Sequence, residues 1–259
     1  MRTQNKLQQQ LVNINSLSVI ERQHLARRLH AEVHEGVIDN ADVSRFTQNV
    51  FERDRDVNLI QTLCDGDRYI GYVAVGIEAI AMDANAQHFA GRKIALGTLR
   101  VMVQPEYRGK WSPSPVLAFT IVKYKCLHPL RVFVLFSAVL SPTAYSLLFR
   151  LTDEIYPNYK FETPKLQAEF MRIFAKNEWG QDYSACYPPF TVDLGSSIKN
   201  EQERIHSKRF RNPHFNYYVN TGNPEFMHGK ALIIVALLPL SQLFVIAKKM
   251  LRSRKLSRR

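Results

Sequence analysis

A β-rich run, a basic turn, a helix-compatible segment and a second β-rich run follow one another between residues 93 and 139. This order restricts the sheet that the chain can build. The first run, KIALGTLRVMV, ends before Pro105, and the helix over residues 113–127 can begin at Pro113 or Pro115. The run RVFVLFSAV is short and nearly all apolar, as in a strand covered on both faces. We therefore expect a mixed sheet with one helical crossover.

Two other β-rich runs precede this unit. VNLIQTLC and YIGYVAVGIEAIAM flank Asp65 and Gly66, a pair that favours a tight hairpin turn. Ser18 and Glu21 fit a capping box at the start of a helix that extends to about residue 29. The predicted fold class is α/β (α+β), with a mixed, mostly antiparallel central sheet flanked by helices.

The last hundred residues are expected to extend this core. We predict a helix from Thr163 and Pro164 and a strand over HFNYYVNTG. Residues 231–247 carry no charge, which fits a buried strand followed by a short helix after Pro239, or a membrane-spanning helix of minimal length. The expected segments are a mobile N-terminus (1–16), a core (17–156), a C-terminal extension that completes or enlarges the sheet (157–247) and a basic tail (248–259).

The net charge of +12, from 35 Lys+Arg against 23 Asp+Glu, is concentrated at the C-terminus. The tail KKMLRSRKLSRR holds seven basic residues and no acidic one, and the rest of the chain carries only +5. The bulk of the chain therefore does not resemble a nucleic-acid binder. The tail suits peripheral contact with an anionic membrane, RNA or an acidic partner, and a solvated tail is the alternative.

The cysteines and histidines indicate neither a disulfide framework nor a metal site. Cys64, Cys126 and Cys186 are about sixty residues apart, which fits no common zinc or disulfide spacing. The eight histidines show no metal-ligand spacing. Sparse cysteines and an N-terminus without a signal-peptide core favour a reducing, cytoplasmic location.

The turn YRGKWSPS has the chemistry of an anion site. A strand that leads into a helix presents backbone N–H groups at the positive end of the helix dipole, which suits phosphate. Gly109 lets the backbone approach a ligand, and Arg108 and Lys110 add positive charge. A simple connection between a strand and a helix is the alternative.

The segment LGTLRVMVQPEYRGKWS, the strand RVFVLFSAV and the helix SPTAYSLLFR together resemble the core of the GNAT (acyl-CoA N-acyltransferase) superfamily. In that family the pattern V-x-P-x-[YF]-R-G-x-G-x-[GA] ends the fourth strand and holds the pyrophosphate of coenzyme A. The resemblance covers roughly residues 57–151. This chain departs from the pattern at Trp111 and Pro113, which stand where the family has glycines.

The resemblance implies an N-acyltransferase that moves an acyl group from acyl-CoA, or from acyl carrier protein, to a small-molecule amine. Coenzyme A would be the co-substrate, and no metal is implied. The length suggests relatives that make acyl-homoserine lactones or N-acyl amino acids. The family's amine enters where the fourth and fifth strands separate. The residues expected to bind the donor are Val101, Val103, Arg108, Gly109, Lys110, Trp111, Ser112 and Ser114.

Two residues are candidates for proton transfer. Glu78 is a lone carboxylate in an apolar strand, so it faces either a cleft, where it could act as a base, or water at an edge. Tyr145 lies in the helix that supplies the family's acid, about one turn before the usual position, and a structural role is its alternative. For the whole chain, the alternatives are a catalytically inactive GNAT-like binding module and a tail-anchored protein.

Overall fold

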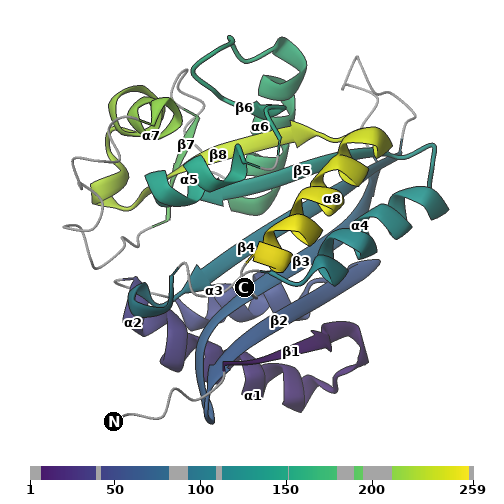
Figure 1. Ribbon diagram of the computed structural model, residues 1–259, viewed down its shortest axis with the longest axis vertical. Helices are drawn as coiled ribbons and strands as arrows, with labels where there is room; N and C mark the ends of the chain where they lie inside the picture. The colour runs from purple at the N-terminus through teal and green to yellow at the C-terminus, as the bar shows by residue number, and fades with distance from the viewer. Residues whose placement is uncertain are drawn as a thin grey trace.

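The computed structural model describes residues 7–38, 42–81, 93–108, 113–150, 152–179, 190–194 and 212–256. The strands of these residues form one eight-stranded sheet in the order β1-β2-β3-β4-β5-β8-β6, with β7 paired to β8 (Figure 1). All pairs are antiparallel except β4 and β5, which are parallel. The strands are β1 (Gln8–Asn13), β2 (Val57–Asp65), β3 (Arg68–Ala81), β4 (Lys93–Val103), β5 (Val132–Val139), β6 (Ile155–Tyr156), β7 (Thr191–Asp193) and β8 (Lys230–Leu237).

Helices cover both faces of the sheet. They are α1 (Val19–Leu29), α2 (Glu35–Val37), α3 (Val43–Thr47), α4 (Pro115–Leu127), α5 (Pro142–Leu148), α6 (Lys165–Trp179), α7 (Pro213–Tyr217) and α8 (Leu240–Leu256). Wider helical turns continue three of them: η2 (His30–His34) after α1, η3 (Gln48–Glu52) after α3 and η8 (Tyr218–Gly222) after α7.

The helix and turn signals in the sequence form the predicted local structures. The Ser18 hydroxyl accepts the N–H of Glu21, and the Glu21 carboxylate accepts the N–H of Ser18, which confirms the capping box of α1. Gly66 adopts a φ of 61° in the β2–β3 hairpin, a conformation that glycine takes without strain. Ser114 and Ser141 cap α4 and α5, and each helix begins with proline.

The two faces of the sheet have separate cores. On one face α4 and α8 lie side by side and pack on residues that include Ile77 and Ala95 (Figure 1). On the other face α1, α3 and η3 cover Tyr72 and Ala74 of β3. A separate hydrophobic cluster on the same face joins α6 to residues of β4, β5 and β8, including Leu96. Alternation along β3 places Ala74, Gly76 and Glu78 on this second face.

The fold class expected from the sequence is confirmed. The sheet is mixed and mostly antiparallel, helices flank it, and α4 is the crossover between the parallel strands β4 and β5. The C-terminal extension enlarges the sheet, because β8 pairs with the free side of β5 and carries β6 and β7. A helix that joins the parallel strands β4 and β5 is the arrangement that the sequence resemblance leads us to expect.

Two expectations differ from the structure, and a third segment takes the first of its two expected forms, a strand followed by a helix. Part of the segment expected to be mobile, residues 8–13, forms edge strand β1 through backbone pairing with β2. The strand expected over HFNYYVNTG is helical, because Asn212 caps the N–H groups of His214 and Phe215 and Pro213 opens the helix. The uncharged stretch forms β8 and the start of α8, and no helix in the described ranges is long and apolar enough to cross a membrane.

Candidate active site

The parallel strands β4 and β5 separate halfway along their length. Their pairing runs from Ile94 and Val132 to Thr98 and Phe136, but β4 continues to Val103 and β5 to Val139. Beyond Thr98 the two strands diverge toward their carboxyl ends (Figure 1). The Ser137 hydroxyl donates to the Leu99 carbonyl oxygen at 2.9 Å where the separation begins. This wedge, at the end of pairing at Thr98 and Phe136, is where the resemblance leads us to expect the strands to separate.

The residues expected to bind the donor are described only in part. Val101 and Val103 lie on the diverging end of β4, and Val101 is 51% exposed. Arg108 is exposed just after β4, where its Nε donates to the Val103 carbonyl oxygen at 3.2 Å. Four further candidates lie outside the described residues: Gly109, Lys110, Trp111 and Ser112.

Ser114 reaches the N-terminus of α4, but its backbone N–H already has a partner. It donates to the Gln61 side-chain oxygen at 2.7 Å, and the Gln61 amide donates in turn to Gln9 of β1 at 2.8 Å. The Ser114 hydroxyl accepts the N–H of Val116 at 3.3 Å. The described start of α4 is therefore hydrogen-bonded within the protein, so a phosphate would depend on Arg108 and the loop before Ser114 for its contacts.

Glu78 lies on β3 beside Leu96 of β4, two residues before the wedge opens. β3 is an interior strand, so the edge position considered for this carboxylate is excluded. Glu78 Oε2 lies 3.2 Å from Arg53 Nε, and among the described residues the buried Oε1 has no hydrogen-bond partner. Burial raises the pKa of Glu78, while Arg53 and Arg55 oppose this rise. A carboxyl with a raised pKa suits a general base.

A network of ion pairs surrounds Glu78. Arg53 pairs with Glu178 as well as with Glu78, and Arg100 Nη2 lies 3.0 Å from Glu178 Oε1. Glu178 comes from the C-terminal end of α6 and its side chain is 7% exposed. Arg53 and Arg100 thus give each oxygen of this buried carboxylate a positively charged partner.

Arg55 lies beneath the same network. Its side chain crosses Gly76 of β3 so closely that a Cβ on that glycine would lie 2.6–2.7 Å from the guanidinium atoms. Arg55 Nη2 donates to the Asn49 carbonyl oxygen at 2.7 Å, and burial lowers the Arg55 pKa to about 10. Gly76 thus provides the space in which this buried arginine lies.

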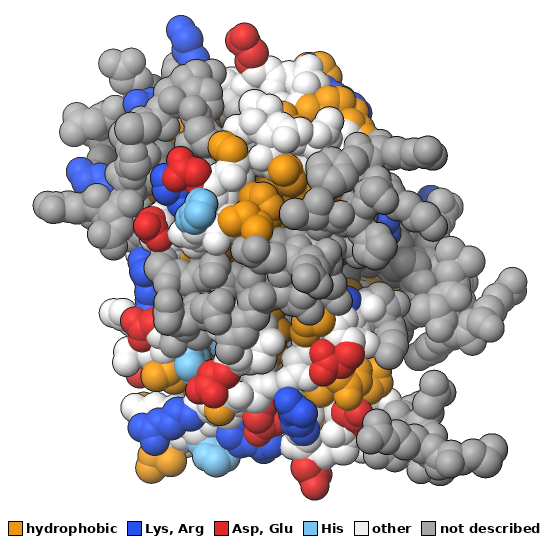
Figure 2. All heavy atoms as spheres, turned by 90° about the vertical axis from the view of Figure 1, so that its left-hand side faces the viewer, with side chains coloured by type: hydrophobic (Ala, Val, Ile, Leu, Met, Phe, Trp, Pro, Cys, Tyr) orange, Lys and Arg blue, Asp and Glu red, His pale blue; other side chains and the backbone are white. Residues whose placement is uncertain are grey.

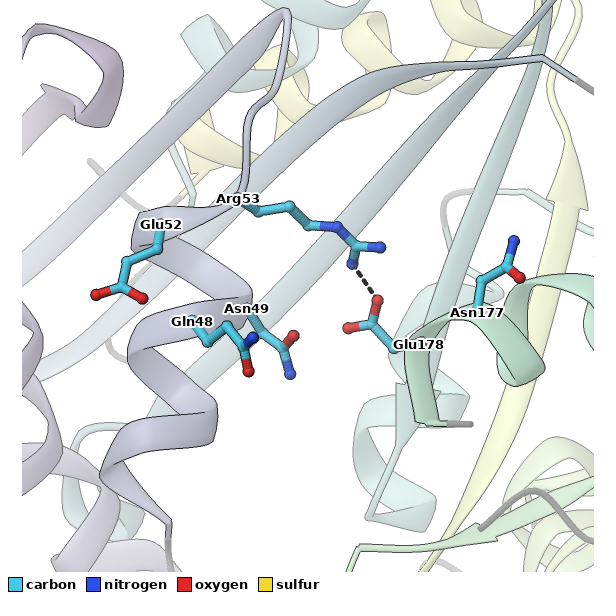
Figure 3. A pocket seen from close by; sticks show the side chains of 6 residues that line it. All are labelled: Gln48, Asn49, Glu52, Arg53, Asn177 and Glu178. Atoms are coloured by element: carbon cyan, nitrogen blue, oxygen red, sulfur yellow. Dashed lines mark hydrogen bonds and ion pairs between the residues drawn. The ribbon is translucent and has the colours of Figure 1, made fainter. Parts of the chain in front are cut away.

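A polar pocket of about 460 Å³ opens beside the network (Figure 3). Arg53 reaches across it from the end of η3 toward Glu178 on α6, while Glu52 points away from this pair. The pocket walls come from two segments more than a hundred residues apart, and all six side chains are polar: Gln48, Asn49, Glu52, Arg53, Asn177 and Glu178. Such a lining offers hydrogen-bond donors and acceptors to a small polar molecule.

Tyr145 lies away from this pocket, on the α4 and α8 side of the sheet. It is fully buried, and its hydroxyl donates to the Pro157 carbonyl oxygen at 2.6 Å. Burial, with Tyr217 and Tyr218 nearby, raises its pKa above the ordinary value. This placement favours the structural alternative for Tyr145.

Sequence reasoning identified Glu78 but missed its partners. Arg53, Arg100 and Glu178 come from a helix end, a strand and a distant helix, so no local motif joins them. Only the register between β3 and β4 could have indicated Arg100, since it places Arg100 opposite Ala74 on the Glu78 face. Among the described residues, no group of three or more His, Cys, Asp and Glu side chains could hold a metal ion.

Neither a protein-family model nor a curated protein matches this chain. Solved structures with a partly similar arrangement include NAA60 from Arabidopsis thaliana in complex with acetyl-CoA, at 13% identity and a TM-score of 0.37, covering 90% of this chain and 99% of that one. A second is the ribosomal-protein-S18-alanine N-acetyltransferase from Escherichia coli, at 13% identity and a TM-score of 0.33, covering 59% and 83%.

A third is a conserved protein of unknown function from Enterococcus faecalis, described as a probable N-acyltransferase, at 10% identity and a TM-score of 0.34. That match covers 55% of this chain and 32% of the E. faecalis chain, about a third of its length. All three TM-scores lie below 0.5, so none of these likenesses assigns this chain to a family.

Proposed function

We propose that this protein is a divergent GNAT-type acyltransferase that transfers an acyl group from acyl-CoA to a small-molecule amine. The observation that carries the proposal is the end of β4–β5 pairing at Thr98 and Phe136. It opens a wedge between two strands next to a half-buried carboxyl of raised pKa, Glu78. A slot for an extended thioester and a base beside it are the two parts that direct aminolysis needs.

The donor is proposed to lie on the α4 side of the sheet. Its diphosphate contacts Arg108 and the residues that follow it, and its arm passes Val103 and Val101 into the wedge. The amine enters from the polar pocket on the other face. Its nitrogen attacks the thioester carbon, Glu78 takes the amine proton, and the C–S bond breaks. The departing thiolate takes a proton from solvent.

The Arg108→Ala substitution tests the donor site. We expect weaker binding of acetyl-CoA or a long-chain acyl-CoA in a calorimetric titration, by roughly tenfold, since one charged phosphate contact is lost. Thermal stability should stay near the wild-type value, because Arg108 is exposed. Arg172→Ala, at an exposed position of α6, is the matched control. Unchanged acyl-CoA affinity in Arg108→Ala would remove Arg108 from the donor site.

Acyl carrier protein is the second donor to test. In the same assay, the wild-type protein is offered acyl-CoA and an acylated carrier protein separately, with the pool of small amines as acceptors. Transfer from acyl-CoA alone is expected. Transfer from the carrier protein alone would leave the reaction class intact and would change the donor.

One observation favours a second candidate, a GNAT-like module that no longer binds coenzyme A. The Ser114 N–H donates to Gln61, so one amide at the α4 N-terminus is already occupied. A thermal-shift screen with coenzyme A, acetyl-CoA and a long-chain acyl-CoA separates the two candidates. A rise in melting temperature with any of them supports the enzyme, and no response to all three supports the module.

A further inference from the structure

Helices α4 and α8 present exposed apolar side chains on the surface that they share. The two helices lie side by side over one face of the sheet (Figure 1), with their inner sides in its core. Their outer sides are unusually apolar for a surface, since Phe119 is 44% exposed and Phe244 is 50% exposed. The exposed large apolar residues of the pair are Val116, Phe119, Leu127, Phe244, Val245 and Leu251.

The same two helices carry basic residues and no acidic one. Lys123 of α4 and Lys248 and Lys249 of α8 are exposed among the apolar side chains. The sequences of α4 and α8 contain no Asp or Glu, and α8 also includes Arg252, Arg254 and Lys255. This combination of exposed phenylalanines and one sign of charge is typical of surfaces that bind anionic interfaces.

Asp56, an acidic neighbour of α4 in the described part of the chain, is itself paired with a basic residue. Asp56 approaches α4 through the Tyr124 hydroxyl, but Arg131 Nη1 also holds its carboxylate at 2.8 Å. Lys125 is directed elsewhere, since its ammonium donates to the Pro129 carbonyl oxygen at 2.8 Å. The side of the molecule shown in Figure 2 differs, because acidic and basic side chains lie close together in its lower part.

We propose that the outer surface of α4 and α8 docks the protein onto an anionic lipid bilayer. The phenylalanines would enter the interface between headgroups and acyl chains, and the lysines would contact acidic headgroups. The exposed apolar residues and the lysines come from two adjacent helices, and a fluid interface accepts such a mixture without a complementary shape. The proposed contact is peripheral, with the helices lying on the bilayer surface.

The test is co-sedimentation of the full chain with vesicles of phosphatidylcholine alone or with about 30% phosphatidylserine. We expect binding to the anionic vesicles, at least about tenfold weaker binding to neutral ones, and loss of binding at about 0.5 M salt. Phe119→Ser and Phe244→Ser should each weaken binding several-fold, and Lys248→Gln with Lys249→Gln should do the same. All four positions are exposed, so the variants should keep the wild-type melting temperature.

Matched controls lie on other helices. Val19→Ser with Ile20→Ser removes two exposed apolar residues from α1, and Lys165→Gln with Arg172→Gln removes two exposed charges from α6. These variants should bind vesicles as the wild type does.

Three results would overturn the proposal. The first is a wild-type protein that does not bind anionic vesicles, including one that binds an acidic carrier protein instead. The second is a control pair that weakens binding as much as the test variants do. The third is an effect of α8 substitutions without any effect of Phe119→Ser, since the surface would then not include α4. The measurement involves no acyl transfer, so it stands apart from the proposed reaction.

Discussion

Glu78 is subject to opposing influences on its ionisation. Burial disfavours its charged form and raises its pKa, whereas Arg53 and Arg55 favour the charged form. Glu178 shares Arg53 with Glu78, and the negative charge of Glu178 raises the pKa of Glu78 further. The result is a carboxylate that is paired on one oxygen and still has a raised pKa, the state that a base for an ammonium group requires.

This raised pKa makes a prediction about stability and pH. Below the unfolded-state value of 4.5, Glu78 is protonated in both states and adds no pH dependence. As the pH rises through the interval up to the folded-state pKa, the unfolded chain ionises first, so the wild-type fold loses stability. Glu78→Gln removes this loss, and its free energy of unfolding relative to the wild type should therefore increase with pH.

Urea unfolding at several values between about pH 4 and about pH 7 measures this difference. Glu162→Gln is the control, because it replaces an exposed glutamate outside the network and shows how much this substitution alone changes the free energy of unfolding. A difference between Glu78→Gln and the wild type that decreases with pH would mean that the folded protein favours the ionised form of Glu78.

Tyr145 makes a separate prediction. Its buried hydroxyl donates to the Pro157 carbonyl oxygen, so Tyr145→Phe leaves that acceptor without its partner. We expect a loss of about 1–3 kcal/mol in the free energy of unfolding, with acyl-transfer turnover of the folded variant within about twofold of the wild type. Turnover lower by a hundredfold or more in a stably folded Tyr145→Phe protein would instead support the family's acid role.

At the scale of the elements, local signals in the sequence predicted several local structures correctly. The capping box at Ser18, the hairpin at Gly66 and the proline-led starts of α4 and α5 depend on neighbouring residues, and all are confirmed. β1 was missed because its polar residues pair through the backbone at a sheet edge, where no apolar alternation is needed.

The residues around α7 and the network beside Glu78 illustrate two other limits. FNYYV has the composition of a strand, but the cap at Asn212 and Pro213 starts a helix there. The network joins Arg53, Arg100 and Glu178 from elements that meet only when the sheet is assembled. The sequence could therefore indicate a lone carboxylate on β3 but not the groups that affect its pKa.

The β4–β5 pair makes the prediction at this scale. Gly97 lies one residue before pairing ends, and a Cβ there would lie 2.5 Å from Cζ of Phe133, which is buried on β5. Gly97→Ala should lower the free energy of unfolding by about 1–3 kcal/mol, because the buried Phe133 ring must shift to make room for the methyl group. Gly36→Ala is the control: its nearest contact would be 3.6 Å, and removing a helical glycine should stabilise the protein by up to about 1 kcal/mol. Equal free energies of unfolding for Gly97→Ala and the wild type in urea unfolding would show that β4 and β5 can shift apart here at little cost.

For the whole molecule, the sheet separates the two proposed substrates. Val101 lies two residues after Leu99 on β4, so the two side chains are on the same face of the sheet. Leu99 packs with Leu117 of α4, and the proposed donor groove therefore lies on the α4 side. Glu78 and the polar pocket lie on the side covered by α3, η3 and α6. The wedge between β4 and β5 is the place where a thioester from one side could meet an amine from the other.

This separation predicts that changes at the two sites act independently. Glu78 is level with Leu96 on β4. Arg108 contacts Val103, which lies seven residues farther along the strand, or about 23 Å at roughly 3.3 Å per residue. Arg108→Ala should weaken donor binding and leave the single-turnover rate at saturating acyl-CoA nearly unchanged. Glu78→Gln should lower that rate by roughly a hundredfold or more without changing donor affinity. In the double variant both effects should appear in full, with a coupling free energy below about 0.5 kcal/mol. A larger coupling would mean that the carboxylate and the arginine contact the same substrate group, which a sheet with one substrate on each face does not allow.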